Sequence, residues 1–156
     1  MILISNSIII QAQVAEVFSF LAKPEMLPKW NYYIKKVHKT SGDGGLGSKF
    51  HQIRKNDEQF FDLSKFERNK LLEFSSSSQS KIKFRRVFTF SAISAGCLIE
   101  DDFHINTGHP LFLQKLLRKS FQKNVYANLI KLKELMEKGQ TTLQDGRVSS
   151  LEVNID

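Results

Sequence analysis

The chain has 156 residues, of which 41% are hydrophobic and 25% charged, with a formal net charge of +7 and one cysteine, Cys97. This length suits one domain that buries its core without disulfides or metals, and this balance excludes a wholly disordered chain. No apolar run approaches the roughly 18 residues of a membrane-spanning helix, and the first residues carry too little basic charge for a signal peptide. Because a single cysteine excludes a disulfide framework, we expect a cytoplasmic protein.

Phenylalanine is unusually frequent, with 13 copies against 3 tyrosines and 1 tryptophan. So many rings either fill a core or line an apolar cavity, because each buried ring contributes roughly 1.5–3 kcal/mol. The positive net charge favours anionic partners, such as nucleic acid, acidic lipid headgroups or carboxylate ligands. It can equally serve only to keep the protein soluble.

The first fifty residues combine strands with short helices. Ile2–Gln11 is rich in isoleucine and predicts a strand. In Val14–Ala22 the apolar residues recur at helical spacing, which predicts a short helix. Glu25–Trp30 predicts a second short helix or a turn, and Tyr33–His38 predicts the next strand. The glycine-rich segment 41–47 favours turns.

Between residues 49 and 105 the sequence is dominated by strand patterns. Lys49–Arg54 and Gln59–Phe66 predict a hairpin, and Leu71–Ser76 predicts another strand. Lys81–Ser91 alternates between apolar and polar residues, and a turn then leads into Cys97–Ile105. Consecutive strands joined by short turns predict an antiparallel meander.

The last predicted element is a long helix. Leu111–Lys138 contains neither glycine nor proline, so its 28 residues predict a helix of about 42 Å. Apolar residues recur along one stripe of it: Leu113, Leu117, Phe121, Val125, Leu129, Leu132 and Met136. Gly139 is expected to cap its C-terminus. The sequence then turns polar, which leaves open a disordered tail or an edge strand at Leu151–Ile155.

Together these elements predict an α+β fold in one domain, residues 1–139, followed by a polar C-terminal tail, residues 140–156. One long amphipathic helix after a run of strands can bury its stripe on the concave face of a curved antiparallel sheet. A sheet wrapped around a single helix leaves room between them, and a small-molecule site is expected in that room.

Several segments of the sequence resemble the START-like domains of the SRPBCC superfamily, and most closely its polyketide cyclase/dehydrase-like branch. They are Ile10–Leu21, Pro24–Trp30, the glycine loop within Val37–Phe50, and Asn128–Lys133 with Met136 and Glu137. This resemblance, over roughly residues 5–139, implies a helix-grip fold with a hydrophobic cavity. It also implies binding of lipids, sterols, polyketides, plant hormones or other apolar molecules; some relatives catalyse cyclisation or dehydration, and others assist protein partners. It implies no catalytic residue, because the superfamily has no single catalytic set.

The last predicted hairpin places a charged pair among aromatic residues. If Ile93 and Ser94 form a two-residue turn, the numbers of opposed residues sum to 187, and Arg86 faces Asp101 on the apolar side. Arg86 would then orient a ligand carboxylate, phosphate or enolate in the cavity, with Asp101 holding its guanidinium. The alternatives are a structural salt bridge, or a one-residue slip that places both side chains in solvent.

Further cavity candidates come from the long helix and the strands. Asn128 lies on the apolar stripe, where its amide needs a partner or a ligand, and Tyr33 would place a phenol in the cavity. The apolar walls are expected from Phe84, Phe88, Ile99, Phe103, Val125 and Leu132.

No cofactor or metal is expected. The 4 histidines include no pair at helical spacing, the glycine loop lacks the Lys-Ser/Thr of a phosphate loop, and no Gly-x-Ser-x-Gly motif is present. Cys97 fits a small packed hydrophobic residue better than a nucleophile.

Four basic residues, Lys115, Arg118, Lys119 and Lys123, recur at helical spacing in the long helix. Because the chain carries no RNA-binding motif, a nucleic-acid partner is not expected. Weak contact with an acidic membrane surface or an acidic protein remains an alternative.

The leading hypothesis is therefore non-covalent binding of a small hydrophobic or amphipathic molecule, such as a lipid or polyketide. The alternative is a cyclase- or dehydrase-type enzyme that uses the same cavity, in which Arg86 stabilises developing negative charge and a tyrosine or Asp101 moves protons. A third hypothesis is an interaction module that uses the basic face of the long helix.

Overall fold

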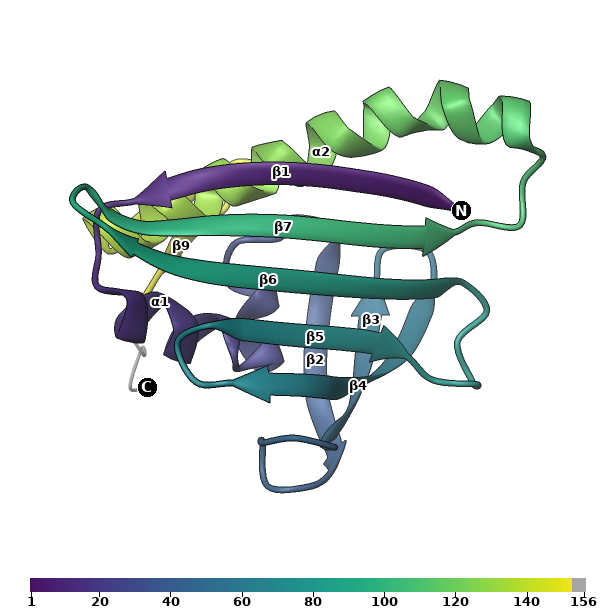
Figure 1. The fold of residues 1–156 in the computed structure, drawn as a ribbon. Coiled ribbons are helices and arrows are strands. Elements are labelled where there is room, and N and C mark those ends of the chain that lie inside the picture. The colour runs from purple at the N-terminus through teal and green to yellow at the C-terminus, as the bar shows by residue number, and fades with distance from the viewer. Residues whose placement is uncertain (153–156) are drawn as a thin grey trace.

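The computed structural model describes residues 1–152, which form a curved sheet, two short helices and one long helix (Figure 1). The helices are α1 (Val14–Leu21), the 3₁₀ helix η1 (Pro24–Lys29) and α2 (Leu111–Lys138). The strands are β1 (Ile2–Ile10), β2 (Ile34–Ser41), β3 (Lys49–Arg54), β4 (Glu58–Glu67), β5 (Leu71–Ser76), β6 (Lys83–Ile93), β7 (Gly96–Asn106), β8 (Gln140–Thr142) and β9 (Val148–Ser150).

Seven strands form one antiparallel sheet in the order β1-β7-β6-β5-β4-β3-β2. Strands β2 to β7 are neighbours in sequence order because short connections join them. Strand β1 pairs instead with β7, because α1 and η1 carry the chain from one edge of the sheet to the other. Helix α2 then lies along β1 (Figure 1). The predicted α+β class, a curved antiparallel sheet with a long C-terminal helix, is confirmed.

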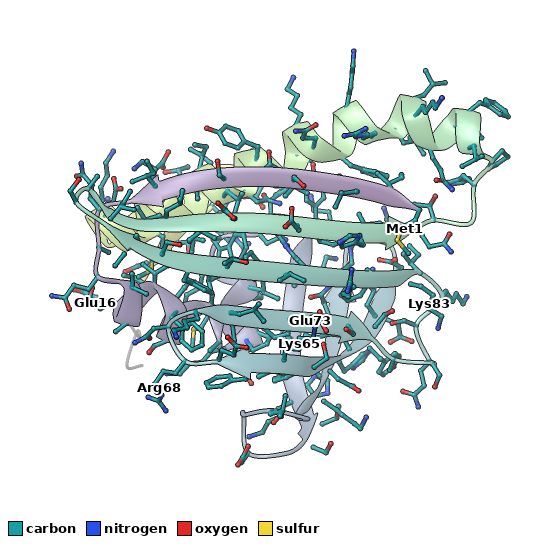
Figure 2. All side chains as sticks on the ribbon, in the orientation of Figure 1. Met1, Glu16, Lys65, Arg68, Glu73 and Lys83 are labelled. Carbon is teal, nitrogen blue, oxygen red and sulfur yellow. The ribbon has the colours of Figure 1, made fainter. Side chains whose placement is uncertain are left out.

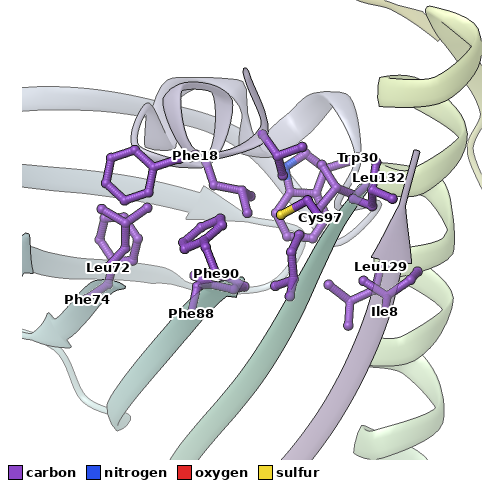
Figure 3. Close-up of a cluster of buried hydrophobic side chains, with 14 of the residues drawn as sticks. Ile8, Phe18, Trp30, Leu72, Phe74, Phe88, Phe90, Cys97, Leu129 and Leu132 are labelled. Carbon is purple, nitrogen blue, oxygen red and sulfur yellow. The ribbon is translucent and has the colours of Figure 1, made fainter. Parts of the chain in front are cut away.

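The apolar core lies around α1 and the C-terminal half of α2 (Figure 3). The Phe18 and Phe90 rings pack edge to face, with their centroids 5.1 Å apart. Cys97 is fully buried in this core, and burial raises the pKa of its thiol although a hydrogen bond with the Ser91 backbone acts in the opposite direction. Leu129 and Leu132 of α2 complete the cluster. This end of the space between sheet and helix is therefore filled by side chains.

Helix α2 is buried over only part of its length. Leu129, Leu132 and Leu135 are fully buried, whereas Leu111 and Leu116 in the first turns are 74% and 72% exposed. The N-terminal half extends past the sheet, above the start of β1 (Figure 1). The helix ends as predicted, because Gly139 adopts φ 79° and its N–H donates to the Leu135 carbonyl oxygen at 2.9 Å.

The β6–β7 hairpin has a different register from the predicted one. Its two-residue turn is Ser94-Ala95, since Ile93 pairs with Gly96. The prediction that Arg86 faces Asp101 directly is therefore wrong: Arg86 faces Phe103, two residues further along. A shift of two residues preserves the face of every side chain, so Arg86 and Asp101 still lie on the same side of the sheet.

Gly96 fixes the position of this turn against the end of β1. It adopts φ +131°, and a Cβ at this position would lie 2.3 Å from the Ile10 carbonyl oxygen. No side chain fits so close to backbone atoms, which explains why the residue after the turn is Gly96 and not Ala95, as the predicted turn would require.

Gly96→Ala is therefore expected to lower the free energy of unfolding by about 3 kcal/mol or more. Gly44→Ala is the matched control, since Gly44 also has a positive φ, +97°, but a Cβ added to it would meet no atom within 4 Å. The control should cost about 1–2 kcal/mol, the backbone contribution alone. Urea unfolding of both variants measures the difference, and equal losses would show that the close approach to Ile10 has no energetic effect.

The segment expected to be a polar tail folds back onto the domain in its described part. Strands β8 and β9 form a two-stranded hairpin, Leu143 between them is buried, and Leu151 packs against the core. Lys29 donates from Nζ to the Ser150 carbonyl oxygen at 2.6 Å. Most of the alternative edge strand at Leu151–Ile155 lies outside the described residues. Within residues 1–152, no helix combines the length and hydropathy that crossing a membrane requires.

An ion pair joins α2 to the end of β1. Lys133 donates from Nζ to the Ile9 carbonyl oxygen and to the Glu137 carboxylate, both at 2.6 Å. The Gln11 N–H donates to the same carboxylate at 2.8 Å. Partial burial would raise the pKa of Glu137, but these hydrogen bonds and the positive charge of Lys133 outweigh it, so its pKa lies below the ordinary 4.5.

Glu137→Gln is expected to lower the free energy of unfolding by about 1 kcal/mol at neutral pH. A carboxylate with a lowered pKa stabilises the fold above its unfolded pKa, and this stabilisation is lost as the pH falls through the folded value. The difference between variant and wild type should thus be larger at pH 7 than near pH about 3, below the ordinary pKa of a glutamate. Urea unfolding at both pH values measures it; the same difference at both would mean that the carboxylate charge is not its source.

Candidate functional site

A cavity of about 430 Å³ lies between the sheet and the middle of α2. Its walls come from α1, η1, strands β2 to β7 and α2, together with the connections beside them. Asn56 and Asp57, on the β3–β4 turn, are its exposed lining residues, so the cavity opens beside this turn. The far ends of β6 and β7 belong to the core instead, since Phe90 and Ile99 are buried and do not line the cavity.

The cavity walls are mainly aromatic. Six of the 13 phenylalanines line it: Phe61, Phe74, Phe84, Phe88, Phe103 and Phe121. The Phe61 and Phe84 ring centroids are 6.0 Å apart, and the Phe84 and Phe103 centroids 5.9 Å apart. Period-two alternation along the strands brings the first five of these rings to one face of the sheet, and α2 contributes Phe121 from the opposite side. The two sequence alternatives for phenylalanine, core and cavity, are thus both realised.

One charged pair lies among these rings. Arg86 donates from Nε and Nη2 to the two carboxylate oxygens of Asp101, at 2.9 and 2.6 Å. Arg86 is 8% exposed and Asp101 1% exposed. The guanidinium carbon lies 4.8 Å from the Phe88 ring centroid and 4.7 Å from that of Phe103, which favours the cation. Asp101 therefore fixes and neutralises an arginine that is part of the cavity wall.

The remaining donors of Arg86 are available to a bound molecule. Arg86 lines the cavity, and Nη1 has no hydrogen-bond partner among the described residues. A planar guanidinium held by two bonds on one side presents its other N–H groups in a fixed direction. Arg86 can therefore donate to a ligand oxygen without rearrangement of the pair.

The second arginine of the cavity is also paired. Arg54 lies near the opening, with its Nε 3.5 Å from the Asp57 carboxylate. Arg54, Asp57 and Arg86 are the charged residues of the lining. With Asp101 behind Arg86, the two positive and two negative formal charges cancel. The cavity is thus electrically balanced without a ligand.

Two buried glutamines supply further polar groups. Gln52 donates from Nε2 to Gln59 Oε1 at 2.8 Å, and both side chains line the cavity. Each occupies an inward position of its strand, two residues from a buried phenylalanine: Phe50 for Gln52 and Phe61 for Gln59. The sequence interpretation missed both glutamines. The available signal was the position of a polar residue in the apolar register of a strand.

The predicted residue Asn128 belongs to a network of amides. It donates from Nδ2 to Asn31 Oδ1 at 3.2 Å, and its Oδ1 accepts from Gln144 at 3.0 Å. The Tyr33 N–H also donates to Asn31 Oδ1, at 3.1 Å. The partner that a buried amide requires is therefore supplied by the protein. Gln144, in the β8–β9 connection, links the C-terminal segment to the cavity wall.

The structure brings most of the predicted cavity residues together. Those that line the cavity are Arg86, Asn128, Tyr33, Phe84, Phe88, Phe103 and Val125. Asp101 lies behind Arg86 rather than in the wall. Ile99 and Leu132 are both 0% exposed and belong to the core. The prediction that these two line the cavity is wrong, because the two-residue register shift moves Ile99 towards the turn and Leu132 lies a turn of helix beyond the hollow part.

The lining carries few groups for proton transfer or covalent chemistry. Among the described residues that line it there is no histidine, cysteine or serine, and the side chains able to exchange a proton are those of Tyr33 and Asp57. Both oxygens of Asp101 are engaged by Arg86. Within residues 1–152, no cluster of three or more His, Cys, Asp or Glu side chains could hold a metal ion.

Comparison with known proteins gives consistent matches. A family model described as polyketide cyclase / dehydrase and lipid transport matches residues 1–137, whereas no curated protein matches. A START superfamily protein from Mycobacterium smegmatis is 15% identical, with a TM-score of 0.70, over 86% of this chain and 98% of that one. The di-domain ARO/CYC StfQ from the steffimycin biosynthetic pathway is 10% identical, with a TM-score of 0.71, over 88% of this chain and 51% of that one. The Aha1 dimer from Colwellia psychrerythraea is 16% identical, with a TM-score of 0.67, over 88% and 97%. At these identities the structural matches establish the START-like helix-grip fold.

Proposed function

The chain belongs to the polyketide cyclase/dehydrase and lipid transport family, and from this premise we propose that it binds a small apolar molecule carrying an uncharged oxygen group in the cavity beside α2. The observation that carries the proposal is the cavity itself, about 430 Å³ in volume and walled by phenylalanines. This volume lies within the range of sites for small organic molecules. Burial of ligand surface against the rings supplies the affinity.

The charge balance of the cavity supports an uncharged ligand. Arg86 and Arg54 are each paired with a carboxylate of the protein, Asp101 and Asp57. A ligand carboxylate would enter a balanced site as an excess buried charge, which costs free energy. A carbonyl or hydroxyl oxygen accepts a hydrogen bond from Arg86 without that cost. Gln59 or Asn31 can hold a second polar group of the same ligand. We place this binding in the cytoplasm, where the reduced thiol of Cys97 persists.

The alternative is a cyclase- or dehydrase-type reaction in the same cavity. Arg86 would stabilise an enolate oxygen, since its free N–H groups line the cavity. A proton carrier is also needed. Asp101 is a poor candidate because Arg86 occupies both its oxygens, so this role would fall to Tyr33. Conversion of the bound ligand into a product, lost in Tyr33→Phe while the ligand affinity stays unchanged, would favour the enzymatic function.

Native mass spectrometry of the freshly purified protein tests the binding proposal. We expect a bound small molecule, which extraction and mass analysis then identify, and displacement of the neutral dye Nile red by that molecule. Displacement by a fatty-acid methyl ester and by the corresponding carboxylate compares the two charge states. The ester should bind at least tenfold more tightly, about 1.4 kcal/mol. No bound molecule together with no Nile red binding would overturn binding, and tighter binding of the carboxylate would overturn the uncharged class.

A further inference from the structure

The first turns of α2 expose large apolar side chains outside the cavity. Leu111, Phe112 and Leu116 are 74%, 65% and 72% exposed. They lie on the part of the helix that extends past the sheet (Figure 1), and side chains from this part point away from the molecule (Figure 2). Single exposed apolar residues are ordinary on a protein surface, but three within six residues of one helix mark an interaction surface.

The same region carries more than half of the excess charge of the protein. Residues 111–123 contain 4 Lys and Arg residues and no Asp or Glu. The remaining residues contain 19 basic and 16 acidic side chains, from totals of 23 and 16. The segment thus accounts for +4 of the net +7. Lys115, Arg118, Lys119 and Lys123 are exposed, and within residues 1–152 none of the four forms an ion pair.

We propose that the N-terminal half of α2, residues 111–123, docks on an anionic lipid membrane. Leu111, Phe112 and Leu116 enter the boundary between headgroups and acyl chains, and the basic residues bind lipid phosphates. Along residues 111–123 the exposed apolar residues are interspersed with the exposed basic ones. A fluid bilayer accepts such a surface without shape complementarity, whereas a protein partner requires it.

Docking of this segment would place the membrane beside one wall of the cavity. Phe121, Asn124 and Val125 line the cavity and follow the exposed turns directly along α2. Thr107, in the connection that leads from β7 into α2, lines it as well. The docking itself does not depend on what the cavity binds. If the cavity holds an apolar ligand, α2 is the element that contacts both the membrane and this ligand.

Co-sedimentation with vesicles tests the docking. We expect the wild-type protein to bind vesicles of phosphatidylcholine with about 30% phosphatidylglycerol, and to bind pure phosphatidylcholine at least tenfold more weakly. Binding should weaken with added salt, because exposed charges are screened. In Phe112→Trp, the fluorescence of the new tryptophan should shift to the blue on anionic vesicles, since the side chain leaves water.

Matched variants distinguish the contribution of the α2 surface to vesicle binding from that of the net charge of the protein. The triple variant Lys115→Gln, Lys119→Gln and Lys123→Gln should lose at least tenfold in vesicle binding. The control is Lys35→Gln, Lys36→Gln and Lys39→Gln, which removes the same charge from exposed residues of β2 and should retain binding. The substituted side chains are exposed, so circular dichroism should show unchanged folding, and Nile red binding should also be unchanged.

Three outcomes would overturn the docking proposal. The first is equal loss in the two triple variants, which would mean that total charge alone attracts the protein. The second is equal binding to neutral and anionic vesicles. The third is tight binding of soluble polyglutamate with no vesicle binding, which would indicate an acidic protein partner. Each result is independent of the Nile red measurement, so failure of docking is distinguishable from failure of ligand binding.

Discussion

Asp101→Asn is expected to lower the free energy of unfolding by about 3–5 kcal/mol. Asp101 is 1% exposed and holds the Arg86 guanidinium by two hydrogen bonds of 2.9 and 2.6 Å. The asparagine is nearly the same size but leaves the arginine charge buried without a counter-charge. Arg86→Met should cost a similar amount, because it leaves the carboxylate uncompensated. Urea unfolding with a fixed slope measures both losses.

The double variant Arg86→Met, Asp101→Leu provides the control. Removal of both charges leaves no buried ion, so its stability is expected to return to within about 1 kcal/mol of wild type or exceed it. A double-mutant cycle then gives the coupling energy of the pair. Because the double variant is expected to fold without the pair, its affinity for the extracted ligand reports the role of the Arg86–Asp101 pair in binding. A loss below about 1 kcal/mol in Asp101→Asn would contradict a desolvated pair.

Val125→Trp is expected to abolish ligand and Nile red binding, by at least a hundredfold, about 2.7 kcal/mol. Val125 lines the cavity, so the indole is expected to occupy volume that a ligand would fill. Apolar surface buried in this way should keep the free energy of unfolding at or above the wild-type value. Isothermal titration of the dye and urea unfolding measure the two quantities on the same sample.

Tyr126→Trp is the matched control for this prediction. Tyr126 is the next residue of α2 but is 45% exposed and does not line the cavity. Its replacement should leave dye binding within about twofold of wild type. If Val125→Trp folds and still binds the dye at wild-type affinity, the cavity is not the binding site. If it unfolds by overpacking, Val125→Phe repeats the test with a smaller ring.

The elements of this fold were predictable because their patterns are strong and local. Lys49–Arg54, Leu71–Ser76 and Leu111–Lys138 were predicted with the bounds that the structure has, since alternation and helical spacing depend on a few neighbouring residues. Register depends on the turn, and the choice of Ile93-Ser94 over Ser94-Ala95 was wrong. The register error was two residues, an even number, so every side chain was still assigned to the correct face of the sheet. Arg86 was therefore placed on the inner face with Asp101.

The sequence pattern could not show which part of a helix or strand lies in the core and which part lines the cavity. Leu132 and Val125 share one stripe of α2, yet one is in the core and the other lines the cavity. Trp30 lies beside Leu132 in the core (Figure 3), whereas Val125 faces the hollow part. The β8–β9 hairpin was missed because its strands have three residues each and Leu143 is the single buried apolar side chain between them. Asn31 was missed because its function in the wall depends on Asn128, 97 positions away.

The filled and hollow ends of the space under the sheet have different mechanical properties. At the filled end, Phe18, Phe90 and Cys97 interlock, and any displacement there would open gaps between packed atoms. At the hollow end, the walls are separated by the cavity. Side chains there can shift by small amounts without losing packing contacts. Binding of a ligand is therefore expected to displace only the middle of α2 and the nearby strand ends. The rest of the fold should stay rigid, so a ligand can enter the cavity without partial unfolding of the protein.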